Sequence, residues 1–399
     1  MVKSAKALST QSWRNALFVV FLINGLGFST WLARVPAIRD GLGLSTAEVA
    51  ALLFTGALGA VSGLAFSSHI IAWVGQRNTI VFFGLLGLAG LVGIGWGSTA
   101  FSSYTLTLVA IIAAGAGNGI ADVAMNVEGA SVERALSRNV MPWFHAFWSL
   151  GTVTGAGLAA LASFVGIGLA AHASAIGLIL TALLLLVSRF LSDDSESGVA
   201  EENSQTTLRE RLAVWKEPRT IAIGLIALGM AFAEGSANDW LALAMVDGRD
   251  VSNATGALWF GLFTAGMMTG RIGGVWVLDR FGRVPVLQGS AVLAVGGLAM
   301  VILIPQLGLS AVGTILWGIG SSLGFPVAMS AAADNPRGSA ARVSAVATLA
   351  YGAFLIGPPL IGGIGSQVGL LVALWAVVAM VVVSLLASPA ATPRTTTSV

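Results

Sequence analysis

The chain has 399 residues, of which 56% are hydrophobic and 10% are charged, with a formal net charge of +2 and no cysteine. A soluble globular domain carries roughly 25% charged residues, so this composition excludes an ordinary water-soluble fold and indicates a bilayer as the solvent. The absence of cysteine excludes disulfides and thiolate metal sites, and the basic residues stand in short loops, which points to membrane topology rather than to nucleic acid.

Twelve stretches are long enough and apolar enough to span a membrane as helices, for which about 20 mainly apolar residues are needed. Strands are not expected, because the runs are continuous, whereas barrel strands alternate over ~10 residues. The apolar stretch near the N-terminus is too long for a signal peptide and counts as the first span. The predicted spans are 15–37, 46–70, 79–99, 104–127, 143–166, 169–191, 219–244, 254–278, 284–305, 309–331, 343–363 and 368–388.

The polar stretch 192–218 separates six spans from six spans. It predicts a cytoplasmic linker between an N-terminal bundle, residues 1–191, and a C-terminal bundle, residues 219–399, which ends in a short cytoplasmic tail. The linker is expected to end in a short amphipathic helix around Leu208–Trp215. Binding of a regulator is the alternative to a plain connector.

The two halves resemble each other at three points, in the same order and at offsets of 209, 204 and 207 residues. The matched segments are STWLA at 29–33 with NDWLA at 238–242, DVAMN at 122–126 with PVAMS at 326–330, and the loop WVGQR at 73–77 with DRFGR at 279–283, aligned on their glycines. A parallel repeat of this kind is expected of two transporter halves. The predicted fold is therefore all-α, with twelve transmembrane helices in two pseudo-symmetric six-helix bundles.

The distribution of basic residues predicts the orientation. With the N-terminus inside, 16 of the 20 Lys and Arg residues fall on the inner side; Arg34, Arg39 and Arg249 fall outside, and Arg271 lies within a span. The positive-inside rule then places both termini in the cytoplasm of a multi-pass protein of the plasma (inner) membrane.

The DRFGR loop is the most specific motif in the chain. An acid, a base, a glycine and a second base between two spans resemble the signature loop of the major facilitator superfamily. The resemblance implies that Asp279, Arg280, Gly282 and Arg283 help to gate the inner side. Gly282 would allow a tight turn. In the first-half copy, Ala72 stands where the acid is expected, so a symmetrical latch is not predicted.

Three further stretches narrow the resemblance to the bacterial YbjJ-type branch, which is distantly similar to fucose permease. They are WLARVPAIRDGLGLS, GAGNGIADVAMNVEGASVE and EGSANDWLALAM. The resemblance covers essentially the whole chain. It implies a class of transporter and does not name a substrate.

Ionisable residues inside spans are costly and mark functional sites. Glu234 lies ~22 Å along the seventh predicted span at ~1.5 Å per residue, with Asn238 one turn later and Asp239 beside it. We expect Glu234 to bind a proton or the substrate; a structural carboxyl bonded to a neighbouring helix is the alternative. Arg271, in the eighth span, would bind an anionic substrate or, as we favour, brace the DRFGR loop.

The first half offers a second group of polar residues. Asp122 and Asn126 are one turn apart in the fourth span, and His145 stands near the start of the fifth. They predict an inner gate or a proton relay, because histidine titrates near neutral pH; helix capping and packing are the alternative. Asn24, in the first span, is a buried amide that could bind a substrate hydroxyl.

The outer ends of the first and seventh spans carry opposite charges. Arg34 and Asp239 are predicted to close an outer gate, although Arg34 could instead snorkel or pair with Asp40. The matched Trp31 and Trp240 are candidate stacking surfaces for a sugar or another planar-faced ligand.

The sequence therefore predicts a secondary active transporter for a small polar solute, a sugar or an organic metabolite, that works by alternating access with proton coupling as an option. A proton-coupled drug or metabolite exporter is the alternative, although the fifth span lacks the glycine-proline motif of many such exporters. No catalytic cluster, metal site or cofactor is expected. The expected partners are the solute and the lipid bilayer, without nucleic acid, around a monomer. A channel or a membrane-embedded enzyme is a competing class.

Overall fold

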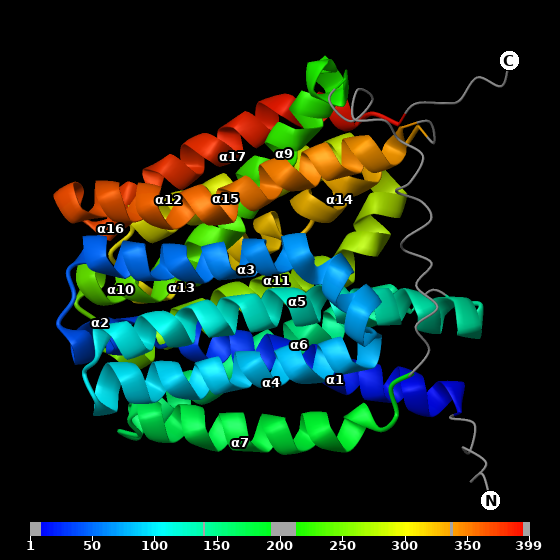
Figure 1. The fold of residues 1–399 in the computed structure, drawn as a ribbon. Helices are drawn as coiled ribbons and strands as arrows, with labels where there is room; N and C mark the ends of the chain where they lie inside the picture. The colour runs from blue at the N-terminus through cyan, green and yellow to red at the C-terminus, as the bar shows by residue number, and fades with distance from the viewer. Residues whose placement is uncertain (1–8, 139, 193–212, 336–337, 394–399) are drawn as a thin grey trace, which may run out of the picture. The chain divides into compact units, whose positions relative to one another are not determined.

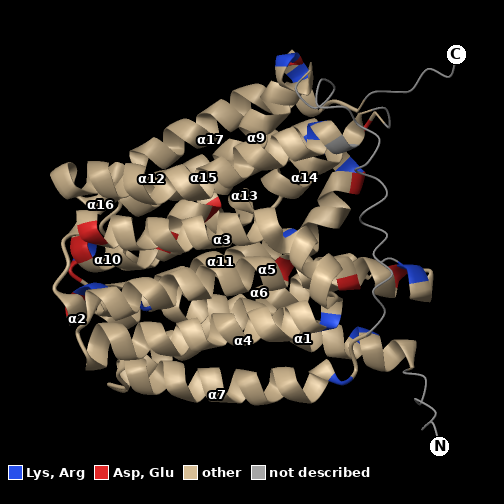
Figure 2. Ribbon diagram, viewed as in Figure 1, with Lys and Arg blue, Asp and Glu red and all other residues tan. Residues whose placement is uncertain are grey.

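The computed structural model describes residues 9–138, 140–192, 213–335 and 338–393, and within these ranges every regular element is a helix. Eleven helical segments in the described residues are long and apolar enough to cross a membrane. The remaining predicted span, the eighth at 254–278, corresponds to α11 (Asn253–Phe281), which has 29 residues and contains Arg271. Lys, Arg, Asp and Glu are sparse along the helices and gather mostly at their ends (Figure 2), as expected of helices surrounded by lipid.

The first six predicted spans are matched by helices traced from blue to green in Figure 1. A short helix, α2, follows the first span, and a π-helical turn, η1, extends the third. The elements are α1 (Thr10–Leu32), α2 (Val35–Leu42), α3 (Thr46–Val74), α4 (Gln76–Gly95), η1 (Trp96–Ala100), α5 (Tyr104–Leu136), α6 (Met141–Phe164) and α7 (Leu169–Ser188).

The second half repeats this order with more interruptions, because its first, fourth and sixth spans are each divided into shorter pieces. Its elements are η2 (Val214–Lys216), α9 (Pro218–Ser236), η3 (Ala237–Leu241), α10 (Ala242–Arg249), α11 (Asn253–Phe281), α12 (Arg283–Leu303), α13 (Leu307–Ser321), α14 (Gly324–Ala332), α15 (Ser339–Val368), α16 (Leu370–Ala373), α17 (Trp375–Ala387) and η4 (Ser388–Ala391).

Most of the predicted linker, residues 193–212, lies outside the described residues, and so does the first part of the amphipathic helix predicted around Leu208–Trp215. In the described remainder, Val214–Lys216 form a single 3₁₀ turn. This turn leads into α9, whose first residue is Pro218, a position that suits proline because the first helical N–H needs no partner.

Contacts divide the chain into two compact units whose limits differ from the predicted bundle limits. The first unit contains Met1–Trp31, Thr55–Leu158 and Ile167–Val199, and the second contains Leu32–Phe54, Ala159–Gly166 and Ala200–Val399. The second unit thus includes α2 and the start of α3 together with the C-terminal half. The bundle limits 1–191 and 219–399 stay a prediction.

Small residues allow close helix packing within each unit. In the first unit α4 lies against α5, and a Cβ on Gly90 would lie 2.5 Å from the backbone N of Ala114. In the second unit α12 lies against α13, and a Cβ on Gly320 would lie 2.5 Å from the carbonyl of Ser290. Helix association in lipid relies on such close approach, since burial of apolar surface gives little advantage there.

The two repeated loops share one backbone feature. Gly75 ends the loop between α3 and α4 at φ 84°, and Gly282 occupies the matching place between α11 and α12 at φ 76°. Side chains other than glycine rarely adopt this conformation. The tight turn predicted at Gly282 is therefore confirmed, and the first half keeps the same turn although its loop has lost the acid.

Candidate functional site

The seventh span is broken near its centre. The 32-residue span Pro218–Arg249 contains the π-helical turn η3, Ala237–Leu241, between α9 and α10. A π turn inserts an extra residue into the helix and is frequent at functional sites. Asn238, Asp239 and Trp240 lie on this turn, and Glu234 lies in the last turn of α9 before it. Four of the predicted site residues thus fall at or beside the same irregularity.

Glu234 is bonded to the neighbouring helix α11. The Nη2 of Arg271 donates a hydrogen bond to Glu234 Oε1 at 3.2 Å, and the side chain of Arg271 is 26% exposed and that of Glu234 18%. This ion pair joins two predicted site residues that sequence reasoning had not paired. The pair agrees with the alternative interpretation of Glu234 as a structural carboxyl bonded to a neighbouring helix. For Arg271, the pair is an interaction that neither of its two predicted roles, binding an anionic substrate or bracing the DRFGR loop, included.

The end of α13 lies close to this ion pair. A Cβ on Gly270, which precedes Arg271, would collide with the side chain of Ser322, and one on Gly324 would collide with Met230, one turn before Glu234. Ser321 is 2% exposed, and its Oγ has no hydrogen-bond partner among the described residues. The tenth span therefore contacts both helices that carry the ion pair, α11 at Gly270 and α9 at Met230.

In the first half, the predicted polar residues Asn24, Asn126 and His145 contact other residues of the same half. Trp148 Nε1 donates to Asn24 Oδ1 at 3.0 Å, so the amide of Asn24 is bonded to the fifth span. Asn126 Nδ2 donates to the backbone carbonyl of Asp122 at 2.8 Å, one turn back on α5. His145 is exposed, and its ring meets Phe21 edge-on at 5.5 Å. A relay through His145 stays a prediction.

Both matched tryptophans are buried, at 9% exposure for Trp31 and 0% for Trp240. The six-membered ring of Trp240 lies against Gly362 of α15, where Ala50 of α3 also approaches. Its Nε1 is buried without a hydrogen-bond partner among the described residues. Stacking of a ligand on either ring would require a different conformation and stays a prediction.

A polar contact within the second unit links α2 to α10 and α11. Arg39 forms an ion pair with Asp247, and Asn253 Nδ2 donates to Asp40 Oδ2 at 3.0 Å. Arg39 also donates to Asp40 at 2.8 Å. Burial alone would lower the pKa of Arg39, but the bonds to the two carboxylates outweigh this effect and raise its pKa. These residues connect the first-half segment 32–54 with the C-terminal half.

The sequence predicted a different outer contact, between Arg34 and Asp239. Arg34, predicted to face Asp239, is buried and donates from Nη1 to the carbonyl of Ala159 at 3.4 Å, so the predicted gate pair stays untested. Arg39 and Asp247 were overlooked because neither lies in a predicted span. Their separation of 208 residues falls within the repeat offsets, so the two residues occupy equivalent positions of the repeat, and this was an available signal.

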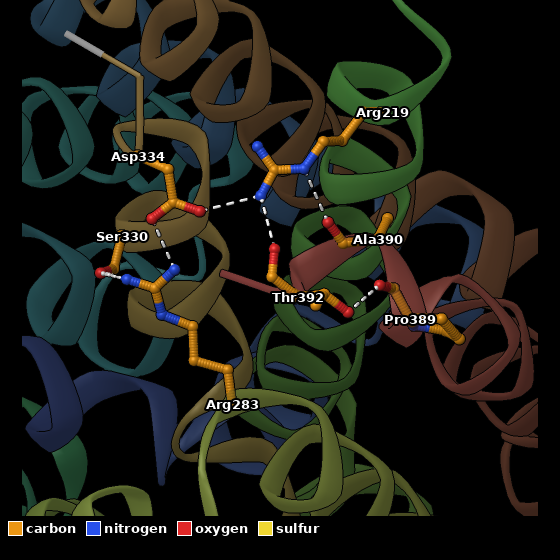
Figure 3. A network of polar contacts seen from close by, with 7 residues as sticks. All are labelled: Arg219, Arg283, Ser330, Asp334, Pro389, Ala390 and Thr392. Atoms are coloured by element: carbon orange, nitrogen blue, oxygen red, sulfur yellow. Dashed lines mark hydrogen bonds and ion pairs between the residues drawn. The ribbon is translucent and has the colours of Figure 1, made fainter. Parts of the chain in front are cut away.

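The signature loop contributes to a charged network around Asp334 (Figure 3). Arg283 Nη1 donates to Asp334 Oδ1 at 2.6 Å, and Arg219 Nη2 donates to Oδ2 at 2.8 Å. Arg283 also donates to Ser330 Oγ, and Arg219 donates to the carbonyls of Ala390 and Thr392. The second arginine of DRFGR therefore holds helices of its own half together. Asp279 and Arg280 are exposed, and their gating role stays a prediction.

Burial alone would raise the pKa of Asp334. The hydrogen bonds and charges of Arg283 and Arg219 outweigh burial, so the pKa of this carboxyl lies below its ordinary value. Asp334 is therefore ionised at every physiological pH, and the network around it is a permanent connection rather than a proton site.

The first unit contains an apolar groove of about 760 Å³ between α3 and α5. Phe66, His69, Trp73 and Ile112 are among its lining residues. None of the predicted site residues lines it, and His69 was not among them.

The major facilitator superfamily model matches residues 139–358. An uncharacterized transporter of Sinorhizobium fredii is 30% identical over 347 residues, which cover 86% of this chain and 88% of that protein. The chain belongs to the major facilitator superfamily. A second superfamily relative, an uncharacterized MFS-type transporter of Yersinia pestis, is 28% identical over 382 residues, or 94% of each chain. The resemblance carried by the DRFGR loop is confirmed, while the YbjJ-type branch stays a prediction.

Solved structures of the superfamily share the fold. A variant of the nucleoside transporter NupG matches with a TM-score of 0.78 over 95% of this chain and all of that chain, at 14% identity. The E. coli fucose:proton symporter FucP matches with a TM-score of 0.64 over 98% of this chain, also at 14% identity. The predicted fold class, an all-α membrane protein with the twelve-helix major facilitator fold, is confirmed.

Proposed function

We propose that this superfamily member is a secondary active transporter that moves a small polar solute by alternating access and that Glu234 carries the coupling proton. The observation that carries the proposal is the Glu234–Arg271 ion pair, held between two spans beside the π turn of the seventh. A carboxylate within a span must be paired or protonated, because an isolated charge in a low-dielectric medium is costly. The proposal therefore gives Glu234 two forms, one bonded to Arg271 and one that carries the coupling proton.

Solved superfamily members support the solute class and the coupling. The titles of two matching structures name a fucose:proton symporter and a D-xylose-proton symporter, and a third names a nucleoside transporter. All three solutes are small and polar. The proposal places the protein in the inner membrane as a monomer with both termini in the cytoplasm, in line with the positions of its basic residues.

The proposal assigns the outer gate to Arg39, Asp40, Asp247 and Asn253. A gate must open in each cycle, so the bonds that close it must be weak enough to break. Arg39 and Asp247 have side chains that are 19% and 33% exposed, and partly exposed ion pairs contribute about 0–1 kcal/mol. These contacts therefore suit a reversible closure better than the network around Asp334, whose carboxyl is 10% exposed and accepts from two arginines.

The test is uptake by purified protein in proteoliposomes, with a solute first found by thermal stabilisation of the protein. Glu234→Gln is expected to abolish accumulation driven by a pH gradient while solute exchange across the membrane continues, because the amide cannot ionise. Asp250→Asn is the matched control, since Asp250 is exposed at a helix end and in a left-handed conformation that asparagine tolerates. Full, pH-responsive accumulation by Glu234→Gln would refute the assignment.

A further inference from the structure

The ion pairs of the second half differ in how tightly they are made. The Asp334 carboxylate accepts from two arginines at 2.6 and 2.8 Å, and Arg342 donates to both oxygens of Glu217 at 2.6 and 2.9 Å. Charge-assisted N–H···O bonds of full strength measure about 2.7–2.9 Å. The Glu234–Arg271 pair has one bond, to one carboxylate oxygen, at 3.2 Å. It is the loosest of these pairs, and it is the pair that lies within the spans.

The surroundings of Glu234 hold few other charges. The described sequences of α13, α14 and α17, which pack near α9, contain no ionisable residue. The helix α15 contributes Tyr351 and, near its start, Arg342, which is bonded to Glu217; η3 contributes Asp239. Arg271 is therefore the cation that balances Glu234, and a change at either partner has to be compensated locally.

Charge balance limits what can enter this site. A neutral solute that separated the pair would leave two opposite charges apart in a low-dielectric medium, which is unfavourable. An anionic solute can replace Glu234 on Arg271 if Glu234 takes up one proton, because the site then holds the solute anion, the guanidinium and a neutral acid. The exchange therefore leaves the net charge of the site unchanged. The proton comes from the aqueous side, and no other bond forms or breaks.

We propose that Arg271 binds an acidic group of the transported solute, a carboxylate or a phosphate, which displaces Glu234 from the guanidinium. The inference rests on the proposed function and names its solute class. A guanidinium presents a planar fork of donors that fits such oxyanions. The junction of α13 and α14 contacts both helices that carry the pair, α11 at Gly270 and α9 at Met230, and Ser321 at the end of α13 has a buried hydroxyl without a hydrogen-bond partner among the described residues. Because Arg271 donates to Glu234 through a single 3.2 Å hydrogen bond, displacing Glu234 costs little interaction energy.

The test compares matched neutral and acidic solutes with the purified full-length chain. The probes are glucose against glucuronate, glycerol against glycerate, and glycerol against glycerol 3-phosphate, read as shifts in melting temperature and as proton uptake from weakly buffered solution. Stabilisation by at least one acidic member, with proton uptake, is expected. If only neutral members stabilise the protein, or if no acidic member does, the inference is overturned.

Variants assign the effect to the two residues. Arg271→Gln should bind the acidic probe at least about 30-fold more weakly, the lower range for truncating one side of a buried charge contact. Arg134→Gln is the matched control, because Arg134 is exposed and bonds Ser131 on its own helix. Glu234→Gln should still bind the probe but without proton uptake. Unchanged binding by Arg271→Gln would overturn the inference.

The same experiments separate failure of this inference from failure of the proposed function. If a neutral probe is carried with a proton and that coupling is lost in Glu234→Gln, the transporter proposal stands and the acidic solute class is wrong. If an acidic probe binds without transport in proteoliposomes, Arg271 is an anion site and the transporter proposal fails. For a monoanion, transport is expected to follow the pH gradient and to be independent of membrane potential, because the exchange is electroneutral.

Discussion

Two polar clusters, one in each half, occupy equivalent places in the repeat and use different chemistry. Trp13 Nε1 donates to Glu128 at 2.6 Å in the first half, and Arg219 donates to Asp334 in the second. Both bonds span 115 residues, and both partners are shifted by 206 residues (219 − 13 and 334 − 128). In each half the bond joins the start of the first span to the end of the fourth.

The chain after the last span of each half also takes part, with the roles of donor and acceptor reversed. In the first half, the backbone N–H of Ser192 donates to Glu128 at 3.0 Å. In the second, Arg219 donates to the carbonyls of Ala390 and Thr392. The fold therefore fixes the position of this polar cluster, or node, in each half, whereas the sequence decides which groups donate the hydrogen bonds. The neutral indole of one half is replaced in the other by a guanidinium that reaches three acceptors.

The largest difference between the nodes is expected in stability. Arg219→Gln should lower the free energy of unfolding by about 3 kcal/mol, because it breaks a partly buried ion pair and also removes two hydrogen bonds to carbonyls. Trp13→Phe removes one hydrogen bond to a carboxyl group and keeps an aromatic ring, so its cost should be about 1.5 kcal/mol. Thermal unfolding in detergent measures both. Equal costs would show that the two nodes are equivalent in strength despite their chemistry.

A second experiment compares the backbone turns of the two repeated loops, of which only the second-half loop has the acid, Asp279. Gly75→Ala and Gly282→Ala should each cost about 1–3 kcal/mol, because both residues have positive φ with extended ψ. A Cβ at either position would meet no atom within 4 Å, so the cost is conformational in both. Melting temperatures should fall by similar amounts. A much smaller effect at Gly75 would show that this turn relaxes in the half without the acid.

The smallest expected effect concerns pH. The pKa of Asp334 is lowered in the folded chain by Arg283 and Arg219, so its contribution to stability is complete above the unfolded pKa of about 3.9 and is lost as pH falls through the folded pKa. The melting-temperature difference between the parent and Asp334→Asn should therefore stay constant from pH 8 to pH 5. A difference that shrinks over that range would show that Asp334 titrates there.

Part of the candidate site was predictable because desolvation leaves few options for charges inside apolar spans. Glu234 and Arg271 could each be selected from sequence on this ground. Their pairing could not, because it depends on how α9 is rotated against α11 and on the π turn that follows Glu234. Arg39 and Asp247 were missed for the opposite reason. They lie outside the predicted spans, where charges are ordinary, and become notable only because the fold brings them together.

The sequence by itself determined the class of molecule, its twelve spans, its repeat and the glycine turn of the signature loop. These follow from local properties: apolar length sets the spans, and a positive φ requires glycine at Gly282. The tertiary structure alone decided which charges meet. Arg283 binds Asp334 within its own half, and Arg271 on α11 binds Glu234 on α9. Such pairs join residues far apart in the chain, and helix rotation and packing, rather than composition, set the distance between them.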